Sequence, residues 1–149
     1  VNVVTVTAGP ASRLPHAAGL AWAARNDDVA VLCEIGDGAI SDGDFHAGLN
    51  FAAVLNAPVV FVVRAEGTIP VSERAEGYGM HGVCIDGRDP EVGRDAVADA
   101  AKRGRKGGGP TLIEARITRG QSVARVGEIS AHESAVEQAL AAAERNGSH

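Results

Sequence analysis

The chain has 149 residues, of which 45% are hydrophobic and 3% aromatic, and its 14 Lys and Arg residues against 19 Asp and Glu residues give a formal net charge of −5. This length suits a single domain around one core, and the negative charge argues against a surface that attracts nucleic acid or anionic lipid. No apolar run approaches the roughly 20 residues that span a bilayer, and Val1 does not begin a signal pattern, so we expect a cytoplasmic protein without a membrane segment.

The first half of the chain predicts two strands, each followed by a helix. Residues 1–7 are β-branched and predict a strand, and residues 29–35 form an apolar run, broken only by Glu34, that is typical of a strand buried on both faces of a parallel sheet. Between them, apolar residues recur at helical spacing: Leu14, Ala17, Ala18, Ala21 and Trp22. After the second strand we expect a helix capped by Ser41, with an apolar face of Phe45, Leu49, Ala52 and Ala53.

The second half of the chain continues this alternation. Strands are predicted at residues 58–63, 82–86 and 111–117, helices at about 90–106 and 131–146, and polar loops at 64–79 and 118–130. Because strands alternate with helices, we expect a single α/β domain over residues 1–149, with a parallel sheet flanked by helices and joined by right-handed crossovers.

The cysteines and two of the histidines are expected to be structural. Cys33 and Cys84 lie in separate apolar runs rather than in a Cys-x-x-Cys pair, so we expect two reduced thiols in the core. His16 and His46 are expected to pack, or to make supporting hydrogen bonds on their helices, rather than to carry a proton in a reaction.

A candidate binding site follows the second strand, where the sequence reads Gly36-Asp37-Gly38. Ligands of open parallel sheets bind beyond the carboxyl ends of the strands. Glycines there let backbone amides approach a phosphate, the helix that follows adds its positive end, and the Asp37 carboxylate suits a magnesium ion. The next strand ends at the same edge, so residues 64–68 should face Asp37, and Glu66 follows Asp37 by 66 minus 37, or 29, positions. Gly-Asp-Gly is also an ordinary turn sequence, which is the alternative interpretation.

Four blocks of the sequence, in this order, carry a resemblance to a known family: "LPHAAGLAWAAR", "GDGAISDGDFHAGLNFAAVLNAPVVFVV", "YGMHGVCIDGRDP" and "GGGPTLIEARITR". Together they resemble the α subunit of thiamine-diphosphate-dependent 2-oxo acid dehydrogenases, the E1 component of the pyruvate and branched-chain enzymes. The resemblance covers roughly Leu14 to Arg119. It implies the diphosphate-binding domain of thiamine-diphosphate enzymes, with thiamine diphosphate and Mg²⁺ as cofactors.

The resemblance also implies site residues. Asp37 matches the first metal ligand of the family, and Gly36, Gly38 and Ala39 match residues that line the diphosphate. Glu66 takes the place of a ligand asparagine, Ala65 replaces its neighbour, and Thr68 stands where the family offers a backbone carbonyl to the metal. Two unit charges about 4 Å apart repel by roughly 4 kcal/mol at an effective dielectric near 20, so a carboxylate at Glu66 predicts weaker binding of the diphosphate.

Two functions follow from this resemblance. The first is an E1 α-like subunit or fragment that decarboxylates a 2-oxo acid and transfers the acyl group to lipoyl, inactive alone and assembled as a homo-oligomer or with an E1 β-like subunit. The second is a catalytically silent relative kept for assembly, which Ala65, Glu66 and the absence of histidine from the loop at 118–130 favour. No catalytic residue is identified.

Overall fold

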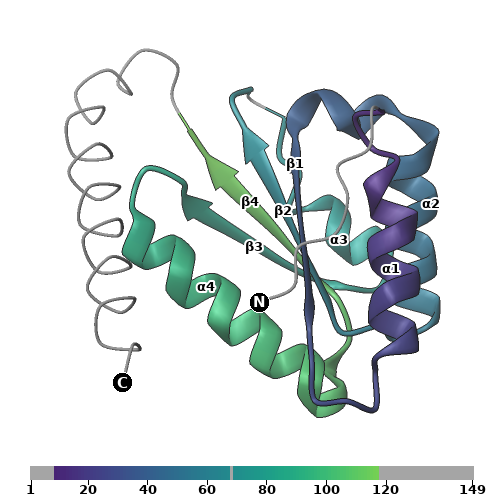
Figure 1. The fold of residues 1–149 in the computed structure, drawn as a ribbon. Coiled ribbons are helices and arrows are strands. Elements are labelled where there is room, and N and C mark those ends of the chain that lie inside the picture. Colours follow the sequence, from purple (N-terminus) through teal and green to yellow (C-terminus); the bar gives the residue numbers. More distant parts are fainter. Residues whose placement is uncertain (1–8, 68, 118–149) are drawn as a thin grey trace, which may run out of the picture. The chain divides into compact units, whose positions relative to one another are not determined.

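The computed structural model describes residues 9–67 and 69–117 (Figure 1). The predicted strand at residues 1–7, the loop at 118–130 and the helix at 131–146 lie outside these residues, as does Thr68. The extent of a single domain beyond Ile117 therefore stays a prediction.

The described residues form a four-stranded parallel sheet with helices on both faces. β1 (Val31–Gly36), β2 (Val59–Ala65), β3 (His81–Asp86) and β4 (Thr111–Arg116) follow the spatial order β1-β2-β4-β3. α1 (Arg13–Ala23) and α2 (Gly43–Val54) lie side by side on one face, α4 (Pro90–Arg103) covers the other, and α3 (Arg74–Gly77) is a single turn before β3 (Figure 1). The predicted α/β class with a parallel sheet is confirmed. Among the helices of this part of the chain, none is long and apolar enough to cross a membrane.

The strand register divides the apolar side chains between two cores. Cys33 lies opposite Phe61, and Phe61 lies opposite Leu112, so these three point to the face that α1 and α2 cover. The neighbouring positions, Val60 and Ile113, point to the other face and pack against α4. Because β2 and β4 are buried on both faces, their sequences read as nearly continuous apolar runs.

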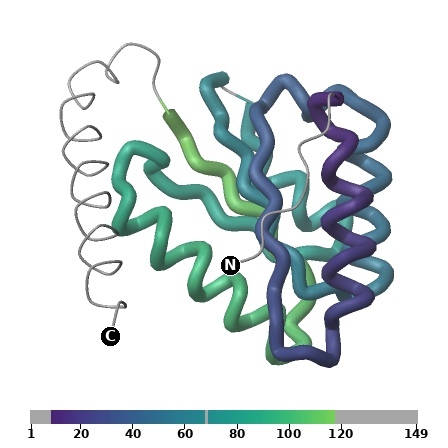
Figure 2. Tube along the Cα trace, viewed as in Figure 1, coloured from purple at the N-terminus to yellow at the C-terminus, as the bar shows by residue number. Residues whose placement is uncertain are grey.

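The two helices on the first face approach each other closely at Gly48 of α2. A Cβ atom at Gly48 would lie 2.5 Å from Leu14 Cβ and 2.8 Å from the Leu14 carbonyl carbon. Leu14 is fully buried and belongs to α1. The trace in Figure 2 shows the chain passing from the end of β1 towards α2, which runs beside α1. This contact therefore fixes the position of α2, the helix that follows the candidate site in the sequence.

Side chains hold the turn that connects α4 to β4. Arg103 donates to backbone carbonyls of the turn and, at 3.0 Å, to Thr111 Oγ1. Asn56 Nδ2 donates to the Gly107 carbonyl at 3.0 Å. Gly107 has φ of 81°, in the region that favours glycine. The helix predicted at about 90–106 is confirmed, although α4 itself ends at Arg103 and is followed by the turn η2 (Gly104–Gly108).

The predicted cap of α2 is wrong. Asp42 rather than Ser41 caps the helix, because the Asp42 side chain accepts a hydrogen bond of 3.1 Å from the Asp44 amide. Ser41 instead ends a short 3-10 helix, η1 (Asp37–Ser41), that lies between β1 and α2.

Two residues of the predicted apolar segments are exposed, and for Cys84 this corrects the expectation of a core thiol. Trp22 is 43% exposed and lies under the Arg25 guanidinium, whose carbon is 4.5 Å from the ring centre, so it is not part of the buried face of α1. Cys84 is exposed, and it lies on β3, which is an edge strand of the described sheet. Cys33, by contrast, is a buried free thiol as predicted.

Candidate functional site

The glycine turn lies at the carboxyl end of β1. Gly36 is the last residue of β1, and Asp37 begins η1. Ala39 is 1% exposed and anchors the turn in the core. Apart from the adjacent residues of the turn, no atom of the described residues lies within 4 Å of a Cβ built on Gly36 or Gly38, so there is space beside the backbone of the turn. The helix that was expected to follow a cap at Ser41 begins at Gly43 as α2, and η1 occupies the residues between the turn and this helix.

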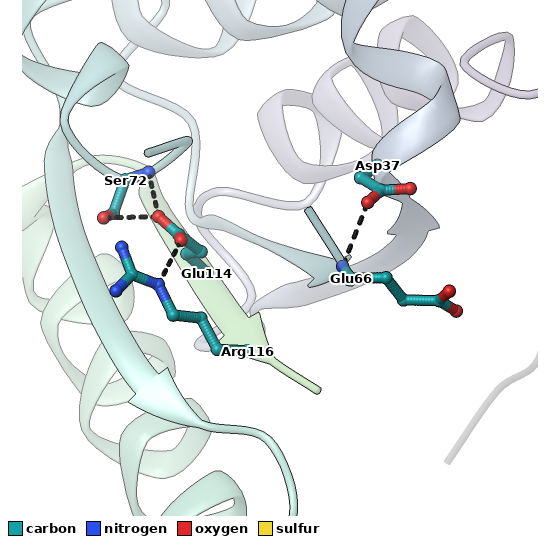
Figure 3. A network of polar contacts seen from close by, with 5 residues as sticks. All are labelled: Asp37, Glu66, Ser72, Glu114 and Arg116. Atoms are coloured by element: carbon teal, nitrogen blue, oxygen red, sulfur yellow. Dashed lines mark hydrogen bonds and ion pairs between the residues drawn. The ribbon is translucent and has the colours of Figure 1, made fainter. Parts of the chain in front are cut away.

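The loop after β2 reaches Asp37. Gly36 lies opposite Arg64 in the parallel register, so the residues that follow both strands meet at one edge of the sheet. The Glu66 amide donates to Asp37 Oδ2 at 3.0 Å (Figure 3). In the part of the chain that the structure describes, no residue donates a hydrogen bond to the other oxygen, Oδ1. The expectation that this loop faces Asp37 is therefore confirmed at Glu66.

The two predicted metal-binding carboxylates do not face each other. The Glu66 side chain points away from Asp37 (Figure 3), and the neighbouring Ala65 is buried. Within residues 9–67 and 69–117, no group of three or more His, Cys, Asp or Glu side chains is arranged to hold a metal ion. Thr68, the third predicted contact, lies outside the described residues. The structure thus brings together the Asp37 carboxylate and the backbone of Glu66.

A pocket of about 340 Å³ adjoins the turn. Gly36, Gly38 and Ala39 line it, together with two arginines, Arg13 and Arg64. Guanidinium groups beside a glycine turn that has space around its backbone favour an anionic ligand such as a phosphate.

Glu34 holds both arginines in place. Its carboxylate pairs with Arg64 Nε at 2.8 Å, and its backbone carbonyl accepts from Arg13 Nη1 at 3.3 Å. The buried Nε of Arg13 has no hydrogen-bond partner among the described residues. Neither arginine was predicted from the sequence as a site residue. Arg64 could have been found, because it directly follows a buried apolar run and so lies at the carboxyl edge of the sheet, whereas nothing local marks Arg13.

A buried carboxylate lies behind the same loop. Glu114 of β4 is fully buried, and its Oε2 accepts from the amide and the hydroxyl of Ser72, each at 2.8 Å, while Oε1 accepts from Arg116 Nε at 2.7 Å (Figure 3). Burial by itself would raise the pKa of Glu114, but the hydrogen bonds from Ser72 and Arg116 outweigh it and lower the pKa below its usual value. The sequence signal was a single carboxylate in an apolar run, which the sequence analysis did not select.

The two histidines make the supporting hydrogen bonds that were expected. His16 Nδ1 is bonded to the Ser12 carbonyl at 2.9 Å. His46 Nδ1 is bonded to the Tyr78 hydroxyl, which ties α2 to the end of α3. Neither histidine lines the pocket beside the turn.

The fold and the site together define the class of this protein: a parallel α/β domain with an open glycine turn, an aspartate and two arginines at the carboxyl edge of its sheet. Residues 2–122 match the family model of the dehydrogenase E1 component. The chain belongs to this family, which confirms the resemblance found in the sequence.

Two relatives illustrate the match. The chain is 40% identical over 127 residues to 2-oxoisovalerate dehydrogenase subunit alpha of Bacillus subtilis, an alignment that covers 76% of this chain and 38% of the relative. It is 44% identical over 114 residues to 3-methyl-2-oxobutanoate dehydrogenase subunit alpha of Mycobacterium tuberculosis, covering 67% of this chain and 31% of the relative. The chain therefore spans about a third of the length of these relatives.

Solved structures agree on the fold. Benzoylformate decarboxylase from Polynucleobacter necessarius superimposes with a TM-score of 0.64 at 16% identity, over 76% of this chain and 25% of that one. An enzyme from Mycobacterium smegmatis that is assigned as thiamin diphosphate-dependent superimposes with a TM-score of 0.57 at 22% identity, over 70% of this chain and 22% of that one. At these identities the likeness concerns the fold alone.

Proposed function

We propose that the chain is part of an E1 α-type subunit that holds thiamine diphosphate and a magnesium ion for the decarboxylation of a 2-oxo acid and the transfer of its acyl group to lipoyl. The observation that carries this proposal is the Asp37 carboxylate at an open glycine turn, held in place by the backbone of the next loop. Family membership supports it, and the relatives described above are named as α subunits of dehydrogenases that act on branched 2-oxo acids.

The residues present fit a diphosphate group. The backbone is open at Gly36 and Gly38, where any larger side chain would stand in the space that a phosphate needs. The buried Nε of Arg13 lacks a partner among residues 9–67 and 69–117, and the pocket beside it has room for a ligand of this size. Arg13 supplies positive charge for a diphosphate, and Arg64, whose charge is paired with Glu34, adds guanidinium donors beside it.

The metal ion is proposed to bind between the turn and the loop. Asp37 Oδ1 is the first ligand, because Oδ2 already accepts from the Glu66 amide. The Glu66 carboxylate and the backbone carbonyl of Thr68 are the further ligands. Since the Glu66 carboxylate points away from Asp37 in this structure (Figure 3), its use as a ligand requires a change of side-chain rotamer.

The chain's own residues hold and orient one end of the cofactor. When bound, thiamine diphosphate supplies the electron sink that decarboxylation needs. Arg13, Arg64 and the backbone of the turn hold its phosphates, and Asp37 fixes the metal beside them. None of the described residues is assigned a proton-transfer step, so the chain is proposed to be inactive by itself.

A partner is proposed to complete the site. Both relatives are named as α subunits, which supports an assembly with an E1 β-like subunit or with further copies of this chain. Apolar side chains are exposed at the end of α2, where Phe51 is 54% exposed and Val54 is 75% exposed. Such side chains are typical of surfaces that a second subunit covers.

Binding rather than turnover tests this proposal, because binding does not require the partner. Isothermal titration of thiamine diphosphate into the purified chain, with and without Mg²⁺, should show magnesium-dependent binding that Asp37→Ala abolishes. Glu66→Asn removes the repulsion of about 4 kcal/mol between the Glu66 carboxylate and the diphosphate. If even half of this repulsion is relieved, the variant should bind more than about tenfold more tightly than the wild type. Glu91→Asn, which removes the same charge from an exposed position in the first turn of α4, is the matched control and should change little.

The outcomes separate the two candidate functions. Magnesium-dependent binding by the wild type supports an E1 α-type subunit. No binding by the wild type, with a gain in Glu66→Asn, supports a silent relative in which the cofactor site was lost at Glu66. Absence of binding in every variant refutes the proposed cofactor site.

A further inference from the structure

The loop between β2 and α3 is fastened at both ends. At its start, the Glu66 amide donates to Asp37 Oδ2 at 3.0 Å. At its end, the amide and hydroxyl of Ser72 donate to Glu114 Oε2, each at 2.8 Å (Figure 3). Next to Ser72, Val71 is fully buried in the core. Both ends of the loop are thus bonded to carboxylates that belong to other elements.

Packing alone does not account for the carboxylate at Glu114. It lies opposite Val63 of β2 and Cys84 of β3, and it is fully buried. Burying a carboxylate is costly, and apolar residues of similar size in place of buried ion pairs often leave stability unchanged or improve it. What the carboxylate adds is a set of hydrogen bonds. The carboxylate accepts two of these from the amide and hydroxyl of Ser72 and the third from Arg116, whose cation balances the charge.

The same strand also contacts the start of the loop. The Ile117 amide, directly after β4, donates to the Ala65 carbonyl at 2.9 Å, and Ala65 precedes Glu66. The end of β4 therefore meets the loop twice, at Ala65 through its backbone and at Ser72 through Glu114. The position at which the loop returns to the sheet depends on the second of these contacts.

We propose that Glu114 is a positioning residue for the site: by holding Ser72, it keeps the loop where the Glu66 amide meets the Asp37 carboxylate. Asp37 Oδ2 is then occupied by the protein, and Oδ1 is left for a metal ion. The coupling between Glu114 and Asp37 is a property of the chain alone. Only its effect on the cofactor rests on the proposed function.

Three variants weaken the contact between Glu114 and Ser72 by different amounts. Glu114→Met keeps the length of the side chain and removes both acceptor oxygens. Glu114→Gln keeps one acceptor, so it must give up either Ser72 or Arg116. Ser72→Ala removes the hydroxyl alone and leaves the backbone bond. The matched control is Thr111→Val, because Thr111 is also a fully buried polar residue of β4 but is bonded to Arg103 rather than to the loop.

The first measurement is amide hydrogen exchange by NMR on the full chain without cofactor. Hydrogen bonds to charged groups are strong enough that losing them in Glu114→Met should speed exchange of the Glu66 amide by about tenfold or more. Glu114→Gln and Ser72→Ala should give smaller increases of at least about threefold, and Thr111→Val should give none. A folded Glu114→Met whose Glu66 amide exchanges at the wild-type rate overturns the proposal. If that variant does not fold, an unchanged rate in Ser72→Ala does the same.

The second measurement is titration with thiamine diphosphate and Mg²⁺. Glu114→Met should weaken binding by about tenfold, in step with the faster exchange at Glu66. If the wild type does not bind but the exchange rates change as expected, the cofactor assignment fails while the positioning of Asp37 by Glu114 stands. If binding weakens while exchange at Glu66 is unchanged, Glu114 acts by another route and the positioning role is refuted.

Discussion

Replacing Gly48 with alanine should destabilise the fold, although alanine is the better helix former. In an open helical position this change stabilises a helix by about 1 kcal/mol. At Gly48, however, the new Cβ would lie 2.5 Å from Leu14 Cβ and 2.8 Å from the Leu14 carbonyl carbon. Carbon atoms in contact are normally about 3.5–4.0 Å apart, so α1 and α2 would have to separate by about 1 Å.

The size of the effect follows from these two opposing contributions. Overpacking of a well-packed core lowers the free energy of unfolding by about 1–3 kcal/mol. The two close contacts with Leu14 place Gly48→Ala near the upper end of this range. Subtracting about 1 kcal/mol for helix propensity leaves a loss of about 2 kcal/mol. For a chain of this length, that loss corresponds to a decrease in Tm of about 8 °C.

Thermal and urea unfolding followed by circular dichroism measures this loss. The matched control is Gly19→Ala, because Gly19 lies in α1 and no described atom is within 4 Å of the position that a Cβ would take there. Gly19→Ala should therefore raise Tm by a few degrees. Equal stability of Gly48→Ala and wild type, or equal losses in both variants, would refute the role assigned to the close approach of α1 and α2.

Three further predictions concern other parts of the fold. Iodoacetamide at pH 8 should modify Cys84 in the native chain and leave Cys33 unmodified, because burial raises the pKa of Cys33 to about 11; mass spectrometry showing equal labelling would contradict this. The pKa of Glu114 is lower in the folded chain than in the unfolded chain, where it is about 4.3. The ionised carboxylate therefore stabilises the fold above about pH 4.3, and this stabilisation is lost as pH falls through the folded-state pKa. Urea midpoints measured from about pH 6 down to about pH 3 should therefore fall less steeply in Glu114→Gln, and parallel curves would argue against the linkage. Arg103→Lys should lower the free energy of unfolding in urea by about 1–2 kcal/mol, because an ammonium group cannot make all the hydrogen bonds of the guanidinium across the turn before β4. Arg94→Lys, at an exposed position, should be nearly neutral, and equal effects of the two variants would contradict the prediction.

The strands were largely predictable because each is marked by an apolar run, and β2 and β4 are buried on both faces as such runs suggest. The expectation that residues 29–35 are buried on both faces is wrong, because β1 is an edge strand of the described sheet and Leu32 is 57% exposed. The predictions at residues 29–35, 58–63 and 111–117 each overlap a strand whose ends lie within two residues of the predicted ends. The cap of α2 was not predictable, since Ser41 and Asp42 are both good caps and only the turn of η1 decides between them. The order of the strands has no local signal either.

The site was predictable only as far as topology determines it. Parallel strands end at one edge, and this placed the loop after β2 beside Asp37, where the Glu66 amide now donates. The direction of the Glu66 side chain and the pairing of Ser72 with Glu114 depend on tertiary contacts between residues far apart in the sequence. Only the three-dimensional structure shows these contacts.

The place of β4 in the sheet has a consequence for how the chain folds during synthesis. β4 is the last described strand in the sequence, yet it lies between β2 and β3, and among the described strands it is the one that β3 pairs with. While β1, α2 and β2 can associate as they leave the ribosome, β3 and α4 must wait until residues 111–116 have been made. Completion of the sheet is therefore expected to be a late step that depends on contacts between distant residues, and such steps are slow. A nascent chain that pauses before Thr111 would expose β3 as an unpaired strand, which makes this interval the one most open to misassembly and to binding by chaperones.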